Sequence, residues 1–214
     1  MLSENIYQEY IAILEEELIP AMGCTEPIAL AYAAARAREV FGGMPDHVTA
    51  WCSGNMIKNV RCVTIPNSGN MMGIEAGVTL GMVGGDAGRQ MEVLESVTPD
   101  DIREAKRLLS KGFCTTQLLD SPVPLHIRLH LTGGGEEVLL EIRHAHTNIT
   151  RIEKNGEVLF AKEDDTGEAK EGADRSLLNL ETIKEFADTV EISRIRDLLE
   201  RQIACNMAIA EEGM

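Results

Sequence analysis

The chain has 214 residues, of which 44% are hydrophobic and 26% are charged, a composition typical of a globular protein and unlike a fibre or a disordered chain. Twenty Lys and Arg residues against thirty-five Asp and Glu residues give a net charge of −15, so we expect neither nucleic acid nor an anionic membrane as a partner. The sequence lacks a membrane-spanning apolar run and a signal peptide, and its five cysteines form no Cys-x-x-Cys pair. These features predict a cytoplasmic protein.

Helical spacing and capping residues predict two helices at the start of the chain. The first runs from Ser3 to near Pro20, and the second runs from about Glu26 to Val40 with Thr25 as its N-cap. Apolar residues then alternate over residues 47–53 and 60–65, which predicts two strands.

The middle of the chain begins with a glycine-rich passage, residues 66–85, whose glycines recur every four residues. This spacing predicts a tight loop followed by a helix that packs closely on a sheet. Thr98 and Pro99 then begin a helix that ends near Ser110, and residues 113–160 read as β structure with a hairpin turn at Asn155-Gly156. Two helices, about 177–189 and 192–211, complete the chain.

These elements predict an α+β fold with a single mixed or antiparallel sheet covered by helices. We divide the chain into an α+β domain over residues 1–162, a charged mobile loop over 163–175, and C-terminal helices over 176–214.

Cys24 lies just before the start of the second helix, where unpaired N–H groups and the helix dipole favour negative charge. A thiolate at this position is suited to bind a metal or to attack an electrophile. The alternative is that Cys24 is a small buried residue at a tight turn.

Three polar residues, Asn55, Lys58 and Asn59, follow the strand that ends at Ser53 in a segment that reads as a loop. An ammonium group and two amides are suited to bind a carboxylate, although such residues are also common as solvated turn formers.

The histidines divide by the face of the strand on which they fall. His144 and His146 share the parity of the apolar residues before them, so they need polar partners or line a cleft. His126 and His130 have the opposite parity in their own strand and are expected to be solvent-exposed.

Several segments together resemble the L-cysteine desulfidase family, which is related to the iron–sulfur-dependent L-serine dehydratases. The resemblance begins at Gly23-Cys24-Thr25-Glu26-Pro27-Ile28-Ala29-Leu30-Ala31 and continues at Ser53-Gly54-Asn55-Met56-Ile57-Lys58-Asn59. It extends through Val63-Thr64-Ile65-Pro66 and resumes at His146-Thr147-Asn148-Ile149.

This resemblance implies a lyase that works without pyridoxal phosphate and uses a 4Fe-4S cluster held by three cysteines, with one iron open to the substrate. It implies elimination from L-cysteine or L-serine to give pyruvate and ammonia, with sulfide as the further product from cysteine. Cys24 matches a cluster ligand. The substrate-binding residues implied are Thr25, Glu26, Asn55, Lys58, Asn59, His146, Thr147 and Asn148.

The resemblance covers only the N-terminal half of the family's pattern, and the remaining cysteines match no ligand. We therefore expect the isolated chain to be inactive. The partners expected are a small-molecule amino acid, a C-terminal catalytic half or subunit, and a second copy of the chain in a homo-oligomer. The general base is not identified. The alternative is a non-enzymatic amino-acid-binding or regulatory module on the same scaffold.

Overall fold

The computed structural model describes residues 2–21, 23–162 and 172–213. Contacts divide the chain into two units, Ala21–Asp164 and Met1–Pro20 together with Asp165–Met214. The predicted boundary after residue 162 lies near this division, whereas the first twenty residues group with the C-terminal segment. Most of the predicted loop, residues 163–171, lies outside the described residues.

The larger unit contains one six-stranded mixed sheet in the order β2-β1-β3-β4-β5-β6, which confirms the predicted α+β class. The strands are β1 His47–Ser53, β2 Cys114–Leu119, β3 His126–Gly133, β4 Glu136–Arg143, β5 Ile149–Lys154 and β6 Glu157–Ala161. Only β1 and β2 pair in parallel, and the other pairs are antiparallel. The hairpin expected at Asn155-Gly156 joins β5 to β6.

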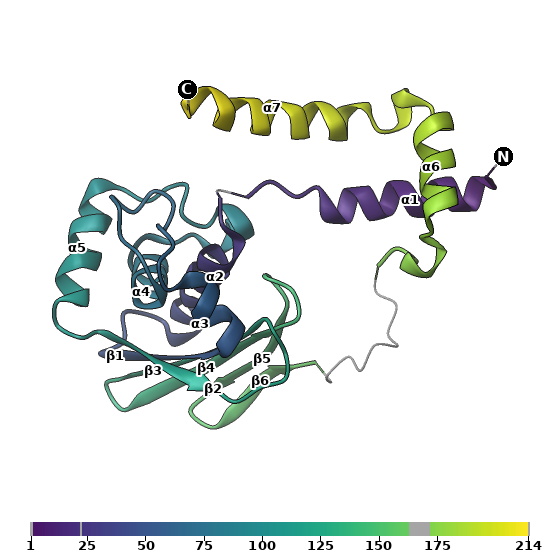
Figure 1. Ribbon diagram of the computed structural model, residues 1–214. Coiled ribbons are helices and arrows are strands. Elements are labelled where there is room, and N and C mark those ends of the chain that lie inside the picture. The colour runs from purple at the N-terminus through teal and green to yellow at the C-terminus, as the bar shows by residue number, and fades with distance from the viewer. Residues whose placement is uncertain (1, 22, 163–171, 214) are drawn as a thin grey trace. The chain divides into compact units, whose positions relative to one another are not determined.

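Helices cover one face of this sheet (Figure 1). The helices on the sheet are α2 Thr25–Phe41, α3 Gly54–Val60 and α4 Ile74–Gly84. Helix α5 Pro99–Leu109 packs on α4, and the short 3-10 helix η1 Ala87–Glu92 packs on α2. The core between helices and sheet is built mainly from aliphatic side chains. Thr98 caps α5 through a capping box with Asp101, as the sequence predicts for this helix start.

Close packing of α2 on α4 explains the glycine spacing. A Cβ atom added at Gly81 would lie 2.3 Å from the carbonyl oxygen of Ala31, and one at Gly85 would lie 3.0 Å from the Cβ of Ala35. The stripe therefore faces α2, and not the sheet as predicted. Gly77 lies against Pro27, so successive glycines of α4 meet successive positions of α2 in the same direction. The two helices therefore run parallel, with their N-termini at the same end.

Parallel neighbouring helices place like ends of their dipoles together, which is unfavourable unless charged side chains compensate. Glu26 and Glu75 lie in the first turns of α2 and α4. At the other end Arg38 donates to the carbonyl oxygens of Met82, Val83 and Gly85, and Lys154 donates to those of Val40 and Phe41. Both ends of the helix pair thus carry charges of the favourable sign.

Two local predictions are wrong. Residues 60–65 form no strand: α3 occupies residues 54–60, and Thr64 makes only an isolated bridge to Met72. The N-cap of α2 is Cys24, and Thr25 is the first helical residue.

The opposite face of the sheet carries polar and aromatic side chains. Trp51 donates from Nε1 to Oε1 of Gln117 at 3.0 Å, and its ring centroid lies 6.1 Å from that of His130. This alternation of apolar and polar faces is typical of an antiparallel sheet with one side packed on helices.

The smaller unit is built from α1 Glu4–Glu17, α6 Leu180–Thr189 and α7 Arg196–Glu212, with the 3-10 turns η2 Arg175–Leu177 and η3 Ile192–Arg194. Its own apolar cluster centres on Tyr10, Ile13 and Phe186. The hydroxyl of Tyr10 donates to the carbonyl oxygen of Leu177 at 2.9 Å, which ties α1 to η2.

Candidate functional site

The carboxylate of Glu26 is the centre of a polar cluster at the N-terminus of α2. It accepts from the thiol of Cys24 at 3.2 Å and from the hydroxyl of Thr25 at 3.3 Å. The amide of Asn59, on α3, donates to its other oxygen at 3.0 Å. Residues from two helices therefore meet at this carboxylate.

These bonds set the charges of the cluster. Burial opposes ionisation of Glu26, but hydrogen bonds from Cys24, from the backbone and from Asn59 outweigh it and lower the pKa of the carboxyl. Partial burial raises the pKa of the Cys24 thiol, and the bond to Glu26 raises it further. Glu26 is thus held as a carboxylate and Cys24 as a neutral donor, whereas the helix dipole alone would favour the thiolate.

His146 lies in the connection between β4 and β5 and interacts electrostatically with Glu26. Burial lowers the pKa of its imidazole, and the charge of Glu26 acts in the opposite direction. The strand ends at Arg143, and His144 turns the chain with a φ of 69°, so the two histidines do not continue the apolar face of β4 as predicted.

The remaining predicted ligands have other surroundings. Asn55 and Lys58 are exposed on α3. Asn148 donates from its side chain to the carbonyl oxygen of Arg143 at 2.9 Å, which closes the turn before β5, and Thr147 precedes it in that turn. The structure therefore gathers Cys24, Thr25 and Asn59 around the carboxylate of Glu26, whose charge also acts on His146.

The donor set around Cys24 does not fit a metal cluster. Among the described residues there is no group of three or more His, Cys, Asp or Glu side chains that could hold a metal ion. Cys52 and Cys114 are buried in the core, and burial raises the pKa of Cys52 to about 12. Since metals bind the thiolate, thiols held in the protonated form are poor ligands.

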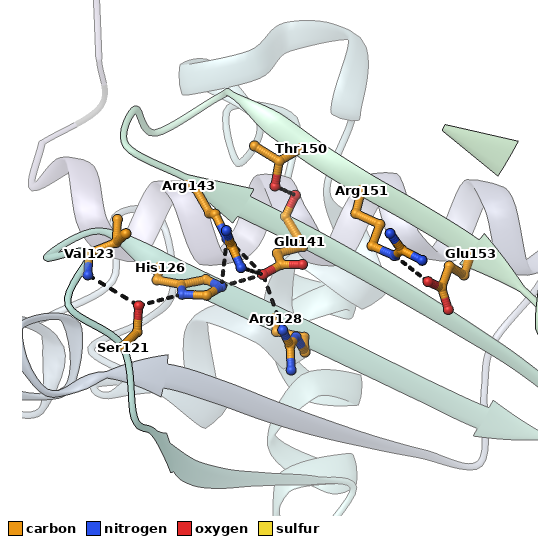
Figure 2. Close-up of polar contacts among 9 residues, drawn as sticks. All are labelled: Ser121, Val123, His126, Arg128, Glu141, Arg143, Thr150, Arg151 and Glu153. Carbon is orange, nitrogen blue, oxygen red and sulfur yellow. Dashed lines mark hydrogen bonds and ion pairs between the residues drawn. The ribbon is translucent and has the colours of Figure 1, made fainter. Parts of the chain in front are cut away.

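A second polar network lies on the face of the sheet that carries no helices (Figure 2). Oε1 of Glu141 accepts from Nε2 of His126, from Arg128 at 3.2 Å and from Arg143 at 2.9 Å. Nδ1 of His126 lies 2.8 Å from the hydroxyl oxygen of Ser121. The network joins β3, β4 and the segment before β3.

This network corrects the expectation that His126 is solvent-exposed, because His126 is 3% exposed and Glu141 is 4% exposed. Burial disfavours the carboxylate, but the bond from His126 and the charges of Arg128 and Arg143 lower the pKa of Glu141 to about 2. The alternation of residues along β3 and β4 could have predicted this buried network. His126 and Arg128 have one parity on β3, and Glu141 and Arg143 have the matching parity on the next strand.

Comparison with known proteins gives relatives that cover almost the whole chain. A UPF0597 protein of Lachnoclostridium phytofermentans is 47% identical over 210 residues, which are 98% of this chain and 50% of that protein. UPF0597 proteins of Treponema denticola and Fusobacterium nucleatum are 41% and 42% identical over 100% and 99% of this chain, and 50% of each relative is covered. No family model and no solved structure matches.

These relatives overturn the identification with an L-cysteine desulfidase or an iron–sulfur L-serine dehydratase. Their names refer neither to a lyase nor to an iron–sulfur cluster. The motif that carried the resemblance has a local structural explanation. Gly23 has a φ of 138°, Cys24 is the N-cap, and Glu26 and Pro27 suit the first helical turn.

The chain spans about half the length of the curated relatives it matches. In the described residues, no helix combines the length and the apolar character needed to cross a bilayer.

Proposed function

We propose that the chain binds a small zwitterionic molecule, of the free amino acid class, at the cluster around Glu26. The observation that carries the proposal is the convergence of Cys24, Thr25 and Asn59 on the ionised carboxylate of Glu26, in the first turn of α2. Glu26 supplies the negative charge that an ammonium group needs. The N–H groups of the first turn of α2 are suited to the carboxylate of the same ligand.

The neutral groups of the cluster support this assignment. The Cys24 thiol and the Asn59 amide both donate to Glu26, so they fix the orientation of its carboxylate. His146 is held toward its neutral form by burial, which leaves one ring nitrogen as an acceptor and the other as a donor. These neutral groups bind polar atoms of a ligand through hydrogen bonds, and Glu26 supplies the negative charge.

The test compares L-serine with 3-hydroxypropionate, which differs by the absence of the ammonium group. We expect calorimetric titration to show saturable binding of L-serine and at least about tenfold weaker binding of 3-hydroxypropionate. Glu26→Gln should abolish the difference, and Glu104→Gln, on the exposed surface of α5, should leave it unchanged. Equal binding of the two compounds, or no binding of L-serine, would refute the proposal.

A further inference from the structure

A separate pocket of about 380 Å³ lies beside the middle and C-terminal part of α2. Tyr32, Arg36 and Glu39 of α2 form one side, Ala87 and Gln90 of η1 form another, and Ile149 at the start of β5 completes it. Its volume is in the range of small-molecule sites. Its residues on α2 follow Glu26 by about two to four helical turns, and it shares none of the residues of the proposed site.

The polar groups of the pocket suit an anion. Tyr32 is 8% exposed and lines the pocket, so it is held in place by the core and brings a phenol to the lining. Arg36 pairs with Glu39 through one N–H at 2.6 Å, in a pair whose side chains are 46% and 41% exposed. Such exposed pairs contribute little free energy, so a ligand carboxylate can replace Glu39 at the guanidinium. The planar guanidinium favours a carboxylate with two parallel hydrogen bonds.

Ala87 and Ile149 give the lining an apolar part beside the polar side chains, which include Gln90. Ala87 is buried, and Ile149 packs partly against the main core. A ligand that fills the pocket therefore needs a short hydrocarbon body beside its charged group.

The backbone of η1 is strained where it borders the pocket. Gln90 has φ 48° and ψ −111°, a conformation that favours glycine. The turn is held by Asp86, whose carboxylate accepts from the N–H of Gly88 and pairs with Arg89, and whose own N–H donates to Val93. Strain of this kind persists where the surroundings hold it and is concentrated at ligand sites.

We propose that this pocket binds a small organic carboxylate with a short apolar body. Arg36 and the Tyr32 hydroxyl bind the carboxylate, and Ala87 and Ile149 contact the hydrocarbon. The proposal concerns a second site and does not depend on the function proposed for the Glu26 cluster.

The experiment titrates the full chain with isovalerate and with isovaleramide, its neutral analogue of the same shape. Changes in NMR methyl shifts report on binding, with the Ile149 methyl group as the local probe. We expect saturable binding of isovalerate, at least about tenfold weaker binding of isovaleramide, and loss of that preference in Arg36→Gln. Tyr32→Phe should weaken isovalerate binding several-fold while the fold is kept.

The matched control is Arg103→Gln, since Arg103 is also an exposed helical arginine paired with an acidic residue three positions away. It should bind isovalerate as the unaltered chain does. Circular dichroism of each variant separates a loss of binding from a loss of folding. The proposal is wrong if isovalerate does not bind to the folded chain, if the amide binds equally well, or if folded Arg36→Gln retains the preference.

Discussion

The side-chain amide of Asn59 donates to Oε1 of Glu26 at 3.0 Å and so joins two helices across 33 residues of sequence. Because the second oxygen of the same carboxylate accepts from Cys24 and Thr25, the charge of Glu26 is fixed beside the thiol. The reactivity of Cys24 therefore depends on a carboxylate that α3 helps to orient.

Glu26→Gln should make Cys24 more reactive. The substitution removes the negative charge that, after burial, raises the pKa of the thiol, so the thiolate fraction at mildly alkaline pH increases. We expect alkylation of Cys24 by iodoacetamide to accelerate by about threefold, measured by mass spectrometry of the peptide that contains it. Alkylation of the exposed Cys62 is the internal control and should not change. An unchanged rate at Cys24 would contradict the proposed coupling.

Glu141→Gln should destabilise the larger unit by about 3 kcal/mol near neutral pH, because it leaves the charges of Arg128 and Arg143 beside a buried neutral group. The pKa of Glu141 falls from 4.5 to about 2 on folding, so its contribution is complete above 4.5 and is lost as the pH falls through that range toward 2. Urea unfolding at about pH 7 and about pH 3 should therefore show a smaller difference between variant and unaltered chain at the lower pH.

Glu153→Gln is the control for this experiment, since Glu153 lies on the same face of the sheet in a more exposed pair with Arg151. Its effect should stay below about 1 kcal/mol at both pH values. A pH-independent loss of stability in Glu141→Gln would mean that shape, and not charge, makes Glu141 important.

Gly81→Ala should destabilise the larger unit by about 3 kcal/mol or more, because the new methyl group would lie 2.3 Å from the backbone of Ala31 and force α2 and α4 apart. Gly43→Ala adds the same group where nothing lies within 4 Å and should have little effect. Thermal unfolding followed by circular dichroism compares the two. Equal melting temperatures would show that α2 and α4 do not pack through the glycine stripe.

Arg38→Met should cost about 2 kcal/mol, because it leaves the last carbonyl groups of α4 without a donor. Arg36→Met, two residues earlier on the exposed side of the same helix, should change the free energy of unfolding by less than about 0.5 kcal/mol. Guanidinium unfolding of the two variants is the measurement, and similar losses in both would argue against a specific role for Arg38.

The regular elements of the sheet unit were largely predictable from local signals. Alternation located β1 and the β3–β4 pair, Asn155-Gly156 located the last hairpin, and the Thr98-Pro99 start located α5. The helix α3 was missed because its seven residues include amides and a lysine that also suit a turn. Its signals were Ser53 as an N-cap and the buried pair Met56 and Val60.

The site was predictable only in part. The start of a helix indicated the residues next to Cys24. The approach of Asn59 to Glu26 depends on how α3 packs against α2, which no spacing in the sequence encodes. The burial of His126 depends on the register between β3 and β4, which brings Glu141 and Arg143 to the same face. The short motif at Gly23 suggested iron–sulfur chemistry because a helix start and a ligand site use the same residue types.

The position of Trp51 has a practical consequence, since it is the single tryptophan of the chain and lies on the helix-free face of the sheet in the unit Ala21–Asp164. Tryptophan fluorescence excited at the red edge of the tryptophan absorption band reports on that unit alone. The ultraviolet absorbance of tyrosine also reports on the smaller unit, which contains Tyr7 and Tyr10. Two spectroscopic probes, without any label, therefore distinguish whether the two units melt as one cooperative block or independently.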